Sequence, residues 1–95
     1  MLPAALRMRR SADFAGTIRS GTRAGRPTLV VHCRLVPERG GRQVGFVVAR
    51  SVGGAVVRNR VRRRLRGVVV DLVDSLPEGT DVVVRALPPA ADASF

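Results

Sequence analysis

The sequence predicts a single α+β domain whose mixed sheet packs against one long, arginine-rich helix. Three observations predict this fold class. Segments 28–36 and 44–50 alternate apolar and other residues with the period of half-buried strands. One apolar stripe then runs from Val57 to Leu76 at helical spacing. A Val-rich segment, 81–87, follows it, and a strand, a helix and a strand in succession imply a parallel pair joined by a crossover.

A short helix is predicted over residues 12–20. Ser11 is its expected N-cap and Gly21 its expected stop. Phe14 and Ile18 lie four residues apart and therefore share one side of this helix.

The first two strands are predicted at Thr28–Val36 and Val44–Arg50, separated by a glycine-containing turn at residues 38–41. A hairpin is the natural pairing for strands so close in sequence. The second strand has two unlike faces. One face carries Val44, Phe46 and Val48, and the other carries the small residues Gly45, Val47 and Ala49.

The small face, beside His32 of the first strand, has two interpretations. It floors a groove for an extended chain, because small side chains let a backbone approach closely. Alternatively, the short helix covers it. Phe14 has the same ambiguity, since a lone Phe opposite Ile18 stacks on a base or belongs to the core.

The long helix is predicted to start at Ala55, after Gly53-Gly54, and to continue to Leu76, with Pro77 and Gly79 ending it. Its apolar stripe consists of Val57, Val61, Leu65, Val68, Leu72 and Leu76. At 100° per residue, the side chains that point away from the stripe are those of Asn59, Arg62, Arg63 and Arg66, with Arg60 and Arg64 on the flank. The helix therefore offers one face to a core and one to a partner.

Positive charge dominates the chain and concentrates on this helix. The formal charge is +10, from 17 basic residues, all arginine, against 7 acids, and no acid lies between Glu38 and Asp71. Like charges four residues apart cost about 0.2–0.5 kcal/mol per pair in an isolated helix. A solvated basic face is the simpler explanation, but guanidinium groups of one sign opposite a clean apolar stripe favour a polyanion. Nucleic acid is the first candidate and an anionic membrane the second.

Other function classes lack the residues they need. No apolar stretch approaches the roughly 20 residues of a membrane span, and arginines replace a signal-peptide core near the N-terminus, so we expect a soluble, cytoplasmic protein. Cys33 is the only cysteine and His32 the only histidine, so no disulfide, metal site or His-based triad is predicted. No constellation supports catalysis by side chains, and Gly53-Gly54 lacks the spacing of a phosphate-binding loop.

Three segments together resemble a known family. They are Arg10-Ser11-Ala12-Asp13-Phe14, residues 45–50 (Gly-Phe-Val-Val-Ala-Arg) and, most specifically, residues 53–66 with their Arg58-Asn59-Arg60 core and following basic run. In these, and from about Leu6 to Ala90, the chain resembles the bacterial ribonuclease P protein subunit. The resemblance implies an α/β sandwich similar to ribosomal protein S5 domain 2, with a left-handed crossover. It also implies that the family's final helix is missing after Phe95.

The resemblance implies an auxiliary role in an RNA-catalysed reaction. In the family, a catalytic RNA subunit performs the Mg²⁺-dependent removal of the 5′ leader from precursor tRNA, and it holds most of the magnesium. The protein has no catalytic residue or metal ligand of its own, and neither DNA nor a membrane is its partner. Carried over by position, the RNA-binding set is Arg50, Arg58, Asn59, Arg60, Arg62, Arg63 and Arg66. The leader-groove set is Phe14, Ile18, His32, Val47 and Ala49.

The rival hypothesis is a structural RNA-binding protein of ribosomal type with no role in processing. A basic helix for DNA or a membrane surface is a third hypothesis, and for a membrane it requires the Val57–Leu76 stripe to be accessible.

Overall fold

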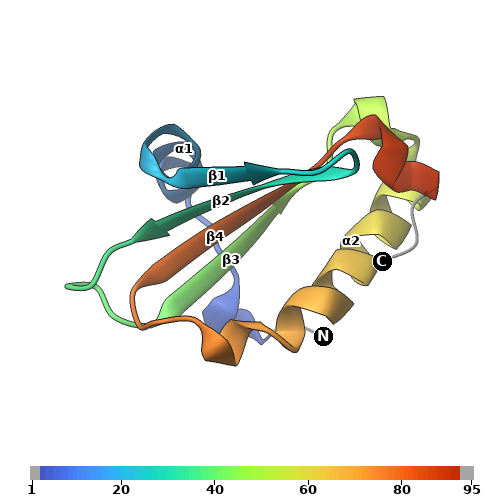
Figure 1. Cartoon of the computed structure of the whole chain (residues 1–95). Helices are drawn as coiled ribbons and strands as arrows, with labels where there is room; N and C mark the ends of the chain where they lie inside the picture. Colours follow the sequence, from blue (N-terminus) through green and yellow to red (C-terminus); the bar gives the residue numbers. More distant parts are fainter. Residues whose placement is uncertain (1–2, 93–95) are drawn as a thin grey trace.

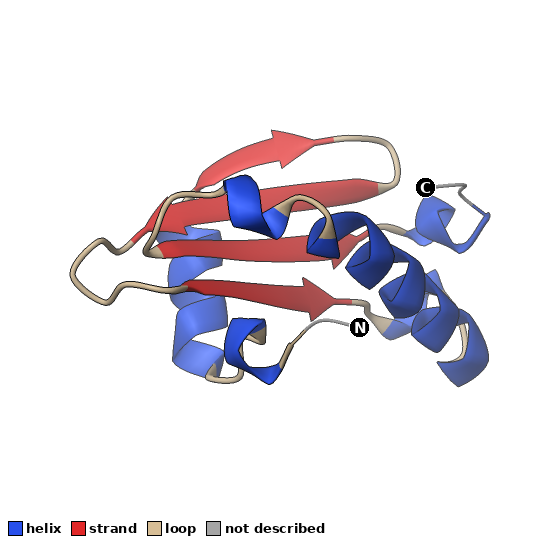
Figure 2. Cartoon of the chain, turned by 90° about the horizontal axis from the view of Figure 1, so that it is seen from below, coloured by secondary structure: helices blue, strands red, loops and turns tan. Residues whose placement is uncertain are grey.

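A four-stranded mixed sheet separates two helices in the computed structural model, which describes residues 3–92 (Figures 1 and 2). The elements are α1 (Ser11–Ser20), β1 (Thr22–Gly25), β2 (Leu29–Leu35), β3 (Arg42–Val47), α2 (Ala55–Val70) and β4 (Thr80–Ala86). Helix α1 lies on one face of the sheet and α2 on the other (Figure 2). The predicted combination of helices and a mixed sheet is confirmed.

The strand order is β1-β2-β4-β3, so β4 lies in the interior of the sheet. It pairs parallel with β3 and antiparallel with β2. The parallel pair joined by a crossover is therefore confirmed. The predicted hairpin of 28–36 with 44–50 is wrong, because β4 lies between those two strands and takes the hydrogen bonds that the hairpin assigned to them.

Two strand assignments also need correction. Strand β1 was not predicted, and all four of its residues are exposed, so it carries no alternating apolar signal. Strand β3 begins at Arg42 and ends at Val47, whereas Arg50 belongs to a 3-10 helix, Arg50–Val52. That 3-10 helix moves the chain from the end of β3 to the start of α2.

Helix α2 is shorter than its apolar stripe predicts. It ends at Val70, and after a turn the chain forms a 3-10 helix over Val73–Ser75. This break changes which residues face the sheet, so Val73 is buried while Leu72 is 58% exposed. The continuous helix to Leu76 is therefore wrong in its last turn and a half.

Both helices begin without a side-chain cap. Ser11 is the first residue of α1 and Arg10 occupies the N-cap position, which corrects the Ser11 N-cap. Gly54 is the N-cap of α2. At the other end of the chain, Pro88–Asp92 forms a 3-10 helix. The expectation that the family's final helix is missing after Phe95 lies outside the described residues.

The main core lies between α2 and the sheet. Val61 and Leu65 of α2 pack against Val44, Val82 and Val84, which belong to the parallel β3–β4 pair. These five side chains are almost fully buried. Burying an aliphatic side chain contributes about 1.5–3 kcal/mol, so this contact fixes α2, and with it the arginine-rich face.

A buried charge cluster fastens α1 to the opposite face. Asp81 has no exposed surface, and its carboxylate pairs with Arg34 Nε at 3.0 Å and with Arg39 Nη1 at 2.6 Å. Arg34 also reaches Asp13 of α1 at 3.5 Å. Its guanidinium lies directly against Gly16, where an added Cβ would overlap it. The cluster therefore places the residue after Asp13, Phe14, relative to the sheet.

Candidate nucleic-acid interface

The outer face of α2 forms an arginine ridge, which we define as Arg58, Asn59, Arg60, Arg62, Arg63 and Arg66. Val61 and Leu65 point into the core, so the residues between them turn outward. Asn59, Arg63 and Arg66 are exposed, whereas Arg58, Arg60 and Arg62 are half-buried. The predicted division of this helix into a core face and a charged face is confirmed.

Several ridge guanidiniums lack acidic partners. Within residues 3–92, Arg58, Arg62, Arg63 and Arg66 form no ion pair. The Nε groups of Arg58 and Arg60 are buried there without a hydrogen-bond acceptor. A buried donor without an acceptor costs free energy, so these two side chains are held at an energetic cost. The exposed Arg63 and Arg66 are the ridge arginines that an outside phosphate reaches directly.

Local contacts shape the ridge. Arg60 donates from Nη2 to the carbonyl oxygen of Ala91 at 3.2 Å, which draws this side chain toward the end of the described chain. Arg62 donates from Nη1 to Asn59 Oδ1 at 3.3 Å. Asn59 therefore orients one arginine, and a hollow opens between Asn59, Arg62, Arg63 and Arg66. Arg50 is exposed in the turn that leads into α2.

The second candidate surface lies between α1 and the sheet. The ring of Phe14 covers Gly45, where any added Cβ would overlap it. Phe14 and Ile18 are both half-buried, so each combines a packed part with an accessible part. The core interpretation of Phe14 is confirmed in part, because the ring packs on the sheet. The ring also lines an open pocket, and stacking on a base stays a prediction.

The small face of β3 changes along its length. Gly45 is buried, Val47 is half-buried and Ala49, beyond the end of the strand, is exposed. The interpretation that α1 covers this face holds at Gly45, because Phe14 lies over it. The face is open only toward Val47 and Ala49.

His32 differs from the exposed groove residue that its position in the set implies. It is 3% exposed, and within the described chain neither ring nitrogen has a hydrogen-bond partner. Burial lowers the pKa of this imidazole, and the positive charges of Arg85 and Arg23 lower it further. His32 is therefore a neutral support beneath the surface near neutral pH.

Sequence reasoning missed three arginines near these surfaces. Arg23 pairs with His32 across β1 and β2, and Arg85 lies between Val30 and Val47 in the next row of the sheet. Arg7 lies beside β3, because Met8 N–H donates to the Val44 carbonyl at 2.9 Å. An isolated bridge such as that of Arg7 with Val44 has no sequence signal. Alternation along the Val-rich segment 81–87, by contrast, would have put Arg85 on the α1 face.

The described residues contain neither a metal cluster nor a membrane span. In residues 3–92, no three His, Cys, Asp or Glu side chains lie close enough to hold an ion. The same part of the chain has no helix with the length and apolar character for crossing a membrane. Cys33 is a free thiol whose pKa burial raises. The interface is therefore made of guanidinium groups, Asn59 and Phe rings.

The family model for ribonuclease P matches residues 2–95. The chain belongs to the ribonuclease P protein family. It is 54% identical to the ribonuclease P protein component of Rhodococcus opacus, with 99% of this chain and 80% of the relative covered. Identity to the component of Beutenbergia cavernae is 60%, over 99% of this chain and 79% of the relative.

Solved structures of the ribonuclease P protein family agree with the fold. The Staphylococcus aureus protein superposes with a TM-score of 0.83 at 28% identity, covering 95% of this chain and 82% of that one. The Thermotoga maritima protein gives 0.75 at 27% identity, over 90% and 77%. The chain is thus the protein subunit of ribonuclease P, the endoribonuclease that matures tRNA 5′ ends, and it works with the RNA subunit of that enzyme.

Proposed function

We propose that the two surfaces have separate tasks: the arginine ridge binds the RNA subunit, and the α1 side of the sheet binds the single-stranded 5′ leader of precursor tRNA. The observation that carries this proposal is the ridge itself, where guanidinium groups without acidic partners lie on a helix fixed by its core face. The protein then brings two polyanions together, and the RNA performs the cleavage.

The ridge suits phosphates rather than bases. Arg58 and Arg66 are eight residues apart, a rise of about 12 Å along the helix axis, so the ridge spans several phosphates. Guanidinium groups bind phosphate oxygens in a bidentate manner. Such contacts carry little sequence information, so in this proposal the ridge recognises the backbone of the RNA subunit rather than its bases.

The groove suits an unpaired strand. Phe14 offers the accessible part of its ring for stacking, and Val47 and Ala49 leave room for a sugar-phosphate backbone. In this proposal Ile18 flanks Phe14, His32 supports the sheet beneath, and Arg50 guides the strand toward α2. A duplex has no unstacked base to offer Phe14, so the leader rather than the tRNA body is the expected occupant.

Magnesium belongs to the RNA in this proposal. The described residues hold no cluster of carboxylates on the interface, and the RNA's own phosphates supply the oxygen ligands that Mg²⁺ prefers. DNA and membranes are not partners. The chain acts in the cytoplasm, where its two RNA partners meet. The strand order and the parallel β3–β4 pair support a fold of the S5 domain 2 type, for which a left-handed crossover is expected.

Reconstitution with the RNA subunit at limiting magnesium tests the proposal. We expect the protein to stimulate leader cleavage, because its arginines offset the phosphate repulsion that magnesium otherwise screens. A structural RNA-binding protein of ribosomal type would bind RNA without stimulating cleavage. That outcome would refute the processing role and favour the rival.

Two variants separate the two surfaces. Replacing Arg62, Arg63 and Arg66 together with glutamate should abolish assembly with the RNA subunit. Phe14→Ala should leave assembly intact and weaken binding of precursor tRNA, with mature tRNA nearly unaffected. Equal losses on precursor and mature tRNA would exclude the groove as the leader site.

A further inference from the structure

A pocket at the outer edge of β3 joins the ridge to the groove. It has a volume of about 160 Å³, many times the roughly 15 Å³ that one water molecule needs. Phe14 and Gly45 reach it from the groove side, and Arg62 and Arg66 reach it from the ridge. Arg62 and Arg66 also line the hollow on the ridge. The two surfaces are therefore continuous around the edge of the sheet.

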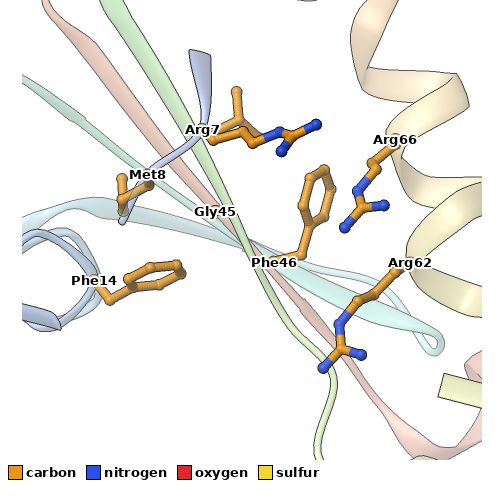
Figure 3. Close-up of a pocket in the computed structure, with 8 residues that line it drawn as sticks. Arg7, Met8, Phe14, Gly45, Phe46, Arg62 and Arg66 are labelled. Atoms are coloured by element: carbon orange, nitrogen blue, oxygen red, sulfur yellow. The ribbon is translucent and has the colours of Figure 1, made fainter. Parts of the chain in front are cut away.

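Positive charge converges on this pocket from two separate elements. Figure 3 shows Arg7, from the segment before α1, and Arg66, from α2, reaching into the space beside the Phe46 ring, with Arg62 below them. Among residues 3–92, the side chains that line the pocket include three guanidinium groups and no carboxylate. An anion that enters this space therefore has charged donors on two of its walls.

The backbone holds Arg7 in place for this role. The segment before α1 forms a parallel bridge with the outer edge of β3 at Val44, and Met8 N–H donates to the Val44 carbonyl at 2.9 Å. The opposite wall is fixed as well, because Val61 and Leu65 anchor α2 in the core. Both walls therefore exist before any ligand binds, which reduces the ordering cost of binding.

We propose that this pocket binds one phosphodiester of the single-stranded leader, with Arg7, Arg62 and Arg66 as its ligands. This inference rests on the proposed function, since it assumes that the leader occupies the groove. The leader is the expected source because Phe14, which belongs to the groove set, lines the same pocket. A strand that leaves the groove beside Phe14 meets these guanidiniums next.

The test combines Arg7→Ala with precursors that carry one uncharged methylphosphonate linkage at successive leader positions. Affinity of the reconstituted holoenzyme is measured without cleavage. With the unaltered protein, we expect one linkage to weaken binding by roughly two- to fivefold, the range of a solvent-exposed charge pair. Arg7→Ala should lose a smaller factor on unmodified precursor, because Arg62 and Arg66 still line the pocket. That linkage should then weaken binding of the variant less than it weakens binding of the unaltered protein, while mature tRNA binds unchanged.

Arg9→Ala is the matched control, because Arg9 is exposed on the same segment and does not line the pocket. A circular dichroism spectrum confirms that each variant is folded. If Arg7→Ala binds precursor as tightly as Arg9→Ala, or loses equally on mature tRNA, the pocket assignment is wrong. If the unaltered holoenzyme does not prefer precursor to mature tRNA, the leader groove itself is refuted and the pocket assignment falls with it.

Discussion

Asp81 has the most demanding environment of any acid in the described residues. Its side chain has no exposed surface and contacts Arg34 and Arg39. A carboxylate taken out of water loses its hydration, and only close, hydrogen-bonded partners offset that loss. Asp81 therefore stabilises the fold only while both arginines stay in place, and through Arg34 and Asp13 it also positions α1.

Asp81→Asn should lower the free energy of unfolding by about 1.5–3 kcal/mol, because it removes charge-assisted contacts from a buried site. Glu78→Gln is the matched control. Glu78 pairs with Arg42 at 3.5 Å with a side chain that is 66% exposed, and such pairs contribute about 0–1 kcal/mol. Urea unfolding of both variants measures the difference. If both variants lose the same free energy of unfolding, the burial of Asp81 does not increase the contribution of its ion pairs to stability.

His32 makes stability depend on pH. Its pKa is lowered in the folded state by burial and by Arg85 and Arg23, whereas the unfolded chain titrates near 6.5. Below that value the unfolded state binds a proton that the folded state rejects, so stability falls as pH drops from about 6.5 toward the folded pKa. It is constant above this window as far as His32 is concerned.

Urea unfolding between pH 7.5 and 5 should therefore show declining stability in the lower half of the range. His32→Asn, which keeps a polar side chain without this titration, should flatten the decline. The two proteins differ only at this side chain, so the comparison isolates the imidazole. A decline of the same steepness in both proteins would show that other groups cause it.

The sequence predicts the structural position of some residues and not of others. Burial of the α2 stripe at Val61 and Leu65 follows from spacing alone, because a helix repeats its faces at a fixed angle. Arg7 does not follow, since its place depends on a backbone bridge to Val44, far along the chain. The sequence likewise did not predict the buried ion pairs of Asp81, because its partners come from β2 and from the turn after β2.

The regular apolar spacing of α2 overestimates the length of the helix. The apolar spacing continues to Leu76, but the chain must turn back toward β4, and the helix ends at Val70. After the turn, Val73 fills the core in place of Leu72. Apolar periodicity predicts which face of a helix is buried. It does not predict the residue at which the helix ends, because that depends on the distance between the end of β3 and the start of β4.

Gly67 offers a test of intrinsic helix propensity within α2. An added Cβ at this position meets nothing within 4 Å, so Gly67→Ala should raise the free energy of unfolding by about 0.5–1 kcal/mol. Gly45→Ala should act in the opposite direction, because its Cβ would overlap the Phe14 ring. Thermal unfolding compares the two variants. Destabilisation by Gly67→Ala would contradict the prediction that helix propensity decides the effect of this substitution.

Strand neighbours were the least predictable feature at this scale. Alternation predicts the faces of β2 and β3, and it placed Val44 and Phe46 together on the α2 side. It carries no information about which strand lies beside which. The short connection between β2 and β3 favoured a hairpin, yet β4 pairs with both strands because its buried residues need apolar neighbours on either side.

The charge of the whole molecule governs how it meets RNA. A formal charge of +10 in 95 residues attracts polyanions generally, and the fixed ridge makes this attraction local. If six phosphates are neutralised, affinity for the RNA subunit should fall about a thousandfold between 50 and 200 mM salt. A filter-binding titration across this range measures the effect, and a nearly flat response would contradict the electrostatic account.

A charge-matched pair of triple variants shows where the salt dependence originates. The slope of log affinity against log salt should lose about two to three units when three ridge arginines become glutamine. Three exposed arginines elsewhere should change it far less when replaced in the same way. The ridge variant carries Gln at Arg62, Arg63 and Arg66, and its control carries Gln at Arg9, Arg19 and Arg26.

The interior place of β4 has a consequence for synthesis. Residues 80–86 hold β2 and β3 together, yet the ribosome makes them after every other strand. A nascent chain that ends before Ala86 has two unjoined strands, while the basic helix is already complete. Assembly of the sheet must therefore await the synthesis of β4, and such long-range pairing is slow.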